Sequence, residues 1–215
     1  ANGDCDVDGL DGGTTGFVRQ MWNANELTTD ESICAWGDPG IPEFNLNQWT
    51  AAHPMLKGFY NRIYVGINYC NQYLEECSGV DAQMTAEIRF LRAFYYLQLM
   101  DCFGNVPFTL GVSSENSQQI ARADLFDFIE KETLEAAESM AEPRTNTYGR
   151  VDKAAAWMLL ARIYLNAEVY TGTAQWAKAA EYAKKVMDSG YELFTNNGAY
   201  EGSVGWSAYQ MLFMG

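Results

Sequence analysis

The chain has 215 residues, of which 28 are Asp or Glu, 14 are Lys or Arg and one is His, so its formal charge is −14. An apolar fraction of 48% with 14% aromatic residues excludes a disordered polyanion and is enough to build a core. The acid excess argues against binding to a nucleic-acid backbone, and no apolar run reaches the ~20 residues that a membrane-spanning helix needs.

Residues 1–52 contain Gly, Asp, Asn, Thr and Pro at short intervals, which predicts a mostly irregular segment with a short helix near 16–25. From residue 54 the apolar residues recur at spacings of three and four, which is typical of helices with one buried face. The predicted helices span 54–77, 81–103, a segment from the N-cap Asp124 to before Pro143, 153–167 and 174–189. Strand patterns are weak, so we expect an all-α fold.

The last two predicted helices carry a repeat pattern. Trp157, Leu160, Ala161 and Tyr164 match the first helix of the tetratricopeptide motif, with Ala in place of Gly. Small residues in the second helix would let the two helices approach closely. We therefore expect tetratricopeptide-like (TPR-like) helical hairpins over 54–215 and an irregular, ligand-facing segment over 1–53, which together form one compact domain.

The first residues and the cysteines suggest no site of strong specificity. Asp4, Asp6 and Asp8 alternate as at the start of a calcium loop, but position twelve is Thr15 instead of a bidentate Glu. A solvated acidic turn is the favoured interpretation, and a metal site is the alternative. The cysteine count is odd, which favours buried thiols over a disulfide framework, the five residues being Cys5, Cys34, Cys70, Cys77 and Cys102.

Motifs for catalysis are absent from the sequence. It contains no G-x-S-x-G, no H-E-x-x-H and no Gly-rich phosphate loop. The single His53 precedes Pro54 at a predicted helix start, where capping or packing explains it. Glycoside hydrolysis needs only two carboxylates, but the sequence singles out no pair. An enzyme is therefore a minor alternative, and no cofactor is expected.

Residues 19–38 have the composition of a carbohydrate site. An indole ring can stack on the C–H face of a sugar, while Arg, Asp and Asn bond its hydroxyls. The alternative is that the two indoles pin an irregular segment to the helical body, and composition alone does not decide between them. The residues concerned are Arg19, Trp22, Asn23, Asn25, Trp36 and Asp38.

Several runs along the chain resemble a known family. They read EIRFLRAFYYL at 87–97, FGNVPF at 103–108, GRVDKAAA at 149–156 and LARIYLNA at 160–167. In this order they are similar to the SusD/RagB family, which are surface glycan-binding lipoproteins of Bacteroidetes outer membranes. The starting segment, including the run AW at 35–36, is similar in particular to the starch-binding prototype of that family.

This resemblance implies a site. By position, Asp11, Arg19 and Trp36 would contact α-glucan, with Trp36 as the stacking ring. Asp38 is added to the candidate site, although the loop around it is one residue shorter than in the family prototype. The expected function is a non-catalytic glycan-binding component of a starch-like uptake system.

The resemblance also implies partners and a location. A TonB-dependent SusC-like outer-membrane transporter would dock on the helical repeats, and a lipid anchor would hold the protein at the cell surface of the outer membrane. Family members are longer and begin with a lipidated Cys; Cys5 lacks an apolar leader, so we expect a truncated N-terminal half without the anchor. The alternatives are a protein-interaction scaffold without glycan binding and a glycoside hydrolase.

Overall fold

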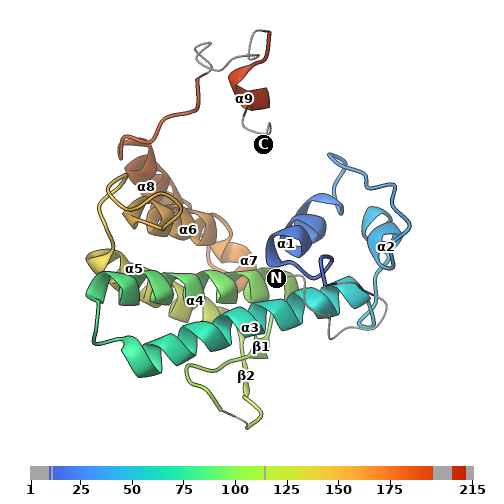
Figure 1. Ribbon diagram of the computed structural model, residues 1–215, viewed down its shortest axis with the longest axis horizontal. Helices are drawn as coiled ribbons and strands as arrows, with labels where there is room; N and C mark the ends of the chain where they lie inside the picture. Colours follow the sequence, from blue (N-terminus) through green and yellow to red (C-terminus); the bar gives the residue numbers. More distant parts are fainter. Residues whose placement is uncertain (1–9, 11, 114, 196–204, 212–215) are drawn as a thin grey trace.

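The computed structural model describes residues 10, 12–113, 115–195 and 205–211 (Figure 1). Helices dominate this part of the chain, and its one sheet is a two-stranded antiparallel pair, β1 (Val106–Pro107) and β2 (Gln119–Ile120). This confirms the predicted all-α fold class. The helices are α1 (Phe17–Glu26), α2 (Ile41–Asn45), α3 (Pro54–Cys77), α4 (Ala82–Phe103), α5 (Arg122–Ser139), α6 (Lys153–Leu165), α7 (Ala167–Thr171), α8 (Trp176–Met187) and α9 (Ala208–Met211).

The long helices form a stack in which each packs against the next: α3 on α4, α4 on α5, α5 on α6 and α6 on α8. Figure 1 shows α3 and α4 running side by side, with α6 and α8 at one end and α1 and α2 at the other. The apolar stripes of the helices meet in one buried cluster, to which each of the long helices contributes, among them Phe59, Ile63, Phe90, Leu97, Ile129, Leu160 and Ala179. Helical hairpins stacked in this way are the arrangement that the repeat pattern predicts.

The helix ends follow from local chemistry. His53 caps α3, because its Nδ1 accepts the Leu56 N–H at 3.2 Å while its Nε2 lies 3.0 Å from the Gly40 carbonyl oxygen. Both ring nitrogens are therefore engaged, which confirms a capping and packing role. Helix α4 ends at Gly104, whose φ of 74° lies in the region that favours glycine.

Three local predictions are wrong. The cap of α5 is Ala121, and Asp124 lies in the first turn instead, because the helix begins earlier than the apolar stripe does. The predicted helix 153–167 ends at Leu165, and Asn166 separates it from the short α7. Helix α2 lies within a segment predicted as irregular, and Pro42 in its first turn supports it.

The N-terminal segment is packed onto the helical body. Phe17 of α1 contacts three rings, with centroid distances of 5.9 Å to Phe59, 6.0 Å to Phe94 and 5.2 Å to Tyr95. A second buried cluster joins α2 to the start of α3 and consists of Leu27, Ile41, Phe44 and Met55, each at most 1% exposed. These contacts fix α1 and α2 relative to α3, so the outer face of the segment has a rigid base.

Further properties concern the described residues alone. None of their helices is long and apolar enough to span a bilayer, and no group of three metal-ligating side chains comes together in them. The candidate calcium turn and Cys5 lie outside the described residues.

The four described cysteines are free, but only Cys70 is buried, where burial raises the pKa of its thiol to about 11. The others are half-buried, so the expectation of buried thiols holds for Cys70 only.

Candidate functional site

The outer face of α1 presents Arg19 and Trp22, which are one helical turn apart. Polar contacts fix the buried side next to them: Gln20 is buried and donates to the Thr14 carbonyl oxygen, and Asn23 is buried and donates to Gln20 Oε1 at 3.3 Å. This inner network determines how the helix is rotated on the body. Arg19 and Trp22 therefore point away from the core.

The chain after α1 returns along this outer face. Two hydrogen bonds join the Cys34 backbone to the Asn45 side chain. Asn45 Nδ2 donates to the Cys34 carbonyl oxygen at 2.7 Å, and Asn45 Oδ1 accepts the Cys34 N–H at 3.4 Å. A turn then leads into α2, in which the Asp38 oxygen accepts the Ile41 N–H at 3.1 Å. Hydrogen bonds to the Asn45 side chain thus tie the segment that carries Trp36 to α2, without making it part of a sheet.

A pocket of about 430 Å³ lies between α1 and this segment. Trp36 is 63% exposed and Trp22 47% exposed, so two indole surfaces meet solvent there. The guanidinium carbon of Arg19 lies 5.5 Å from the centroid of the Trp36 ring, within cation–π range. The full lining is Arg19, Trp22, Asn23, Ile33, Cys34, Ala35, Trp36 and Ile41.

The structure brings together two of the four predicted site residues. Arg19 and Trp36 share the pocket, and the Trp36 ring lies open to solvent instead of pinning the segment to the body. Asp38 is half-buried in the turn before α2 and does not line the pocket. Asp11 lies outside the described residues.

The arrangement provides an exposed indole surface with the Arg19 guanidinium over the ring. None of the ion pairs among the described residues involves Arg19, so its N–H groups are not committed to a carboxylate within that part of the chain. The fixed fork of a guanidinium can donate to two neighbouring oxygens. A ligand with one apolar face and hydroxyl groups at its edge fits this combination.

Trp22 is a pocket residue that the predicted site set leaves out. Its three-residue spacing from Arg19 would have indicated a shared face if the helix over 16–25 had been used to orient the side chains. Asn23 also lines the pocket and, four residues after Arg19, carries the same signal, whereas Ile41 carries none. Ile41 comes from α2, whose position depends on the cluster with Leu27 and Met55.

Comparisons with a family model and with a known protein point to the same family. A family model described as "Starch-binding associating with outer membrane" matches residues 15–165, more than half of the chain. The starch-binding protein SusD of Bacteroides thetaiotaomicron is 42% identical over 200 residues, which is 91% of this chain and 36% of that protein. The chain therefore spans about one third of the length of this relative.

Solved structures show the same fold. A SusD-like carbohydrate-binding protein from Bacteroides fragilis superimposes with a TM-score of 0.61 at 26% identity, covering 70% of this chain and 30% of that chain. A SusD homologue from Bacteroides thetaiotaomicron gives a TM-score of 0.68 at 23% identity, covering 82% and 38%. The second likeness, at this identity, concerns the fold alone.

Proposed function

The chain belongs to the SusD-like family, whose members associate with the outer membrane, and on this premise we propose that it binds starch-like α-glucan at the pocket of Trp36 without cleaving it. The observation that carries the proposal is the exposed Trp36 ring beside the Arg19 guanidinium. A buried ring would leave no surface for stacking. The 42% identical relative is named as a starch-binding protein, which supports an α-glucan as the ligand.

The physical basis is the two-sided character of a glucose ring. Its C–H groups form an apolar face that packs on an indole, and its hydroxyls lie around the edge. Trp36 would take the face and Arg19 would donate to the hydroxyls at the edge. Trp22, at the other side of the pocket, would contact the neighbouring sugar unit.

The two aspartates are assigned separately. The family resemblance supports Asp11 as an acceptor for sugar hydroxyls near Arg19. Asp38 would act only at the outer rim, because its backbone is tied to Ile41 and its side chain does not line the pocket. Substitution of Asp38 should therefore weaken binding less than substitution of Trp36.

Delivery and anchoring also belong to the proposal. We propose that the helical stack docks on a TonB-dependent SusC-like transporter and that the whole protein is held at the cell surface by a lipid anchor. Exposed apolar side chains on the outer face of the stack support a docking role, among them Met158 at 54% exposed on α6 and Trp176 at 61% exposed on α8.

Isothermal titration of the chain with maltoheptaose tests the binding proposal. Trp36→Ala should weaken affinity at least about tenfold, or ~1.4 kcal/mol, because aromatic anchors in a site carry much of the binding energy. Trp176→Ala is the matched control, since it removes an exposed indole far along the chain, and its affinity should equal that of the wild type. Equal affinities of Trp36→Ala and wild type would reject the site.

Two other outcomes correspond to the alternatives. Absence of glycan binding with retained transporter capture would indicate an interaction scaffold. Release of reducing sugar from maltoheptaose during the titration would indicate a glycoside hydrolase. Both results would contradict the proposed non-catalytic binding of glycan.

A further inference from the structure

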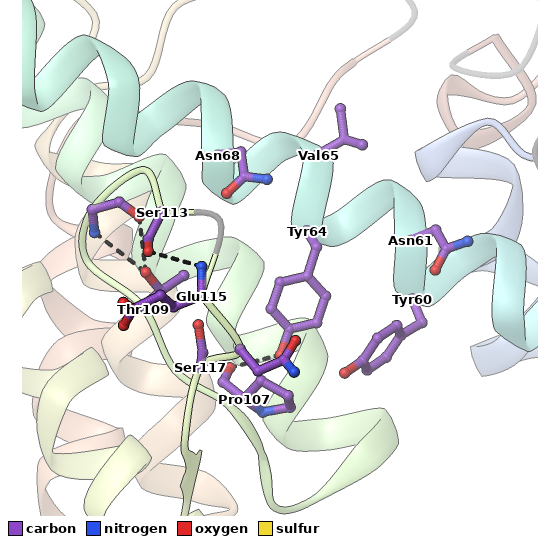
Figure 2. A pocket seen from close by; sticks show the side chains of 12 residues that line it. Tyr60, Asn61, Tyr64, Val65, Asn68, Pro107, Thr109, Ser113, Glu115 and Ser117 are labelled. Carbon is purple, nitrogen blue, oxygen red and sulfur yellow. Dashed lines mark hydrogen bonds between the residues drawn. The ribbon is translucent and has the colours of Figure 1, made fainter.

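A second and larger groove, of about 660 Å³, lies between α3 and the connection from β1 to β2 (Figure 2). It shares no lining residue with the pocket of Trp36. Its volume is within the range of sites that bind small molecules. One wall is helical and carries Tyr60 and Tyr64, and the other is the loop that carries Ser113 and Glu115 (Figure 2).

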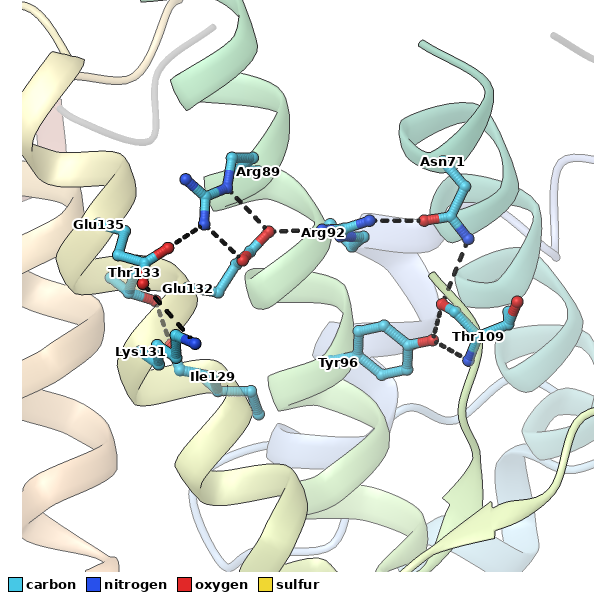
Figure 3. Close-up of polar contacts among 10 residues, drawn as sticks. All are labelled: Asn71, Arg89, Arg92, Tyr96, Thr109, Ile129, Lys131, Glu132, Thr133 and Glu135. Atoms are coloured by element: carbon cyan, nitrogen blue, oxygen red, sulfur yellow. Dashed lines mark hydrogen bonds and ion pairs between the residues drawn. The ribbon is translucent and has the colours of Figure 1, made fainter. Parts of the chain in front are cut away.

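The loop wall is fixed by contacts to the helices behind it. Thr109 donates its N–H to the Tyr96 hydroxyl at 2.9 Å and accepts from that hydroxyl at 2.7 Å. The amide of Asn71 donates to the Thr109 oxygen at 3.3 Å, and its oxygen accepts from Arg92 at 3.0 Å (Figure 3). Further along, Glu75 Oε1 accepts the Val112 N–H at 2.9 Å. The start of this wall is therefore pre-organised, which reduces the entropic cost of binding.

The helical wall presents two phenol rings whose orientations are also fixed. Tyr60 and Tyr64 lie 4.7 Å apart between centroids at an interplanar angle of 54°, and Tyr60 packs edge-on against Phe103 at 5.3 Å. The Tyr64 hydroxyl donates to the Pro107 oxygen at 2.6 Å. Burial, together with the neighbouring Tyr60, raises the pKa of Tyr64, so the phenol stays neutral. The ring of Tyr64 thus contributes a surface to the groove, while its hydroxyl is already paired.

The remaining polar lining groups select the ligand class. They are three amides, Asn61, Asn68 and Asn116, two serine hydroxyls, Ser113 and Ser117, and the carboxylate of Glu115. None of the described residues that line the groove is Lys, Arg or His, which disfavours phosphate, carboxylate and nucleic-acid ligands. Amides, hydroxyls and a carboxylate are donors and acceptors that suit sugar hydroxyls, and an aromatic ring suits a sugar face.

We propose that this groove is a second carbohydrate-binding site, which takes a neutral oligosaccharide independently of the Trp36 pocket. The sugar face would rest on the Tyr64 ring, and its hydroxyls would bond Asn68 and Glu115. Because both side chains are exposed, they are available to a ligand and their removal leaves the core intact. Two sites on one chain would raise the avidity for a long polysaccharide that reaches both.

Backbone amide NMR of the labelled chain tests this proposal, with maltotriose, cellotriose and xylotriose added to about 10 mM, enough to detect a dissociation constant near 1 mM. Residues 60–68 and 109–117 should shift with at least one trisaccharide, in the wild type and in Trp36→Ala alike. Persistence in Trp36→Ala separates this site from the first one, since loss of the first site would leave these shifts unchanged.

The variant that tests the contacts is Asn68→Ala with Glu115→Ala. Its dissociation constant at the groove should rise at least about fivefold, because two hydrogen bonds to the ligand are lost. Tyr69→Ala is the matched control, since Tyr69 is 71% exposed on the same helix but does not line the groove. Unshifted amides in both segments with all three sugars, or an unchanged constant in the double variant, would overturn the proposal.

Discussion

Glu132→Gln tests how strongly the buried ion pair between α4 and α5 stabilises the fold. Glu132 Oε1 accepts from Arg92 at 2.6 Å, and both side chains are only 8% exposed (Figure 3). Arg89 adds two further bonds to the same carboxylate, at 2.8 and 3.2 Å. Removal of the negative charge leaves the guanidinium of Arg92 buried without a counter-charge.

The expected cost follows from that geometry. Breaking a buried pair by removing one partner costs about 3–5 kcal/mol, and the lower end applies because Gln keeps an accepting oxygen. About 3 kcal/mol corresponds to a fall in Tm of roughly 6–12 °C for a chain of this size. Glu135→Gln is the matched control, since Glu135 pairs with Arg89 at 2.6 Å but is 45% exposed, and an exposed pair contributes less than about 1 kcal/mol.

Urea unfolding followed by circular dichroism measures both variants, and its pH dependence provides a second check. Burial alone would raise the pKa of Glu132, but the hydrogen bonds from Arg89 and Arg92 outweigh it and hold the pKa below its ordinary value of 4.5. The stabilisation is therefore complete above pH 4.5 and is lost as the pH falls through the folded-state pKa. The gap between wild type and Glu132→Gln should narrow in acid; equal stabilities of Glu132→Gln and Glu135→Gln at pH 7 would refute the reasoning.

Two further substitutions test the packing and capping of the stack. A Cβ atom at Gly66 would lie 2.6 Å from the Tyr95 ring, so Gly66→Ala should lose about 1–2 kcal/mol of unfolding free energy despite its better helix propensity. A Cβ atom at Gly79 would meet no atom within 4 Å, so Gly79→Ala should lose no unfolding free energy through a clash. Equal losses in the two variants would contradict a close approach of α3 and α4. Asp152 caps α6 and also accepts from the Arg144 N–H and the Tyr191 hydroxyl. Asp152→Ala should therefore lose about 2–3 kcal/mol of unfolding free energy, measured by thermal unfolding. Asp81 is an exposed cap of α4, and Asp81→Ala should lose only ~1 kcal/mol. Similar losses in the two cap variants would show that the extra bonds of Asp152 contribute nothing.

The long helices could be predicted from sequence because each buries a continuous apolar stripe. The three- and four-residue spacings of Phe59, Ile63 and Ile67 define α3, and a capping Asp81 defines the start of α4. Short helices cannot be predicted in this way, because they carry no such stripe. Five residues, as in α2 and α7, are too few to show a period, and their positions are decided by tertiary contacts.

The two binding surfaces differ in how far sequence reasoning reaches. Composition and family resemblance predict Arg19 and Trp36 as site residues. Composition alone also points to Trp22, and the structure places it in the same pocket. The groove on α3 could not be predicted, since Tyr64 meets Pro107 across 43 residues of chain. Such contacts depend on how α3 and α4 pack, which no local pattern specifies.

The resonances of the indole Nε1–H groups give the most direct test of glycan binding at Trp36. Addition of maltoheptaose to the labelled chain should shift the Trp36 signal most and the Trp22 signal next, because both indoles line the pocket. The signal of Trp176, which is exposed on α8, should stay in place. A Trp36 signal that does not move while the sugar binds elsewhere, or while no binding occurs at all, would contradict the account.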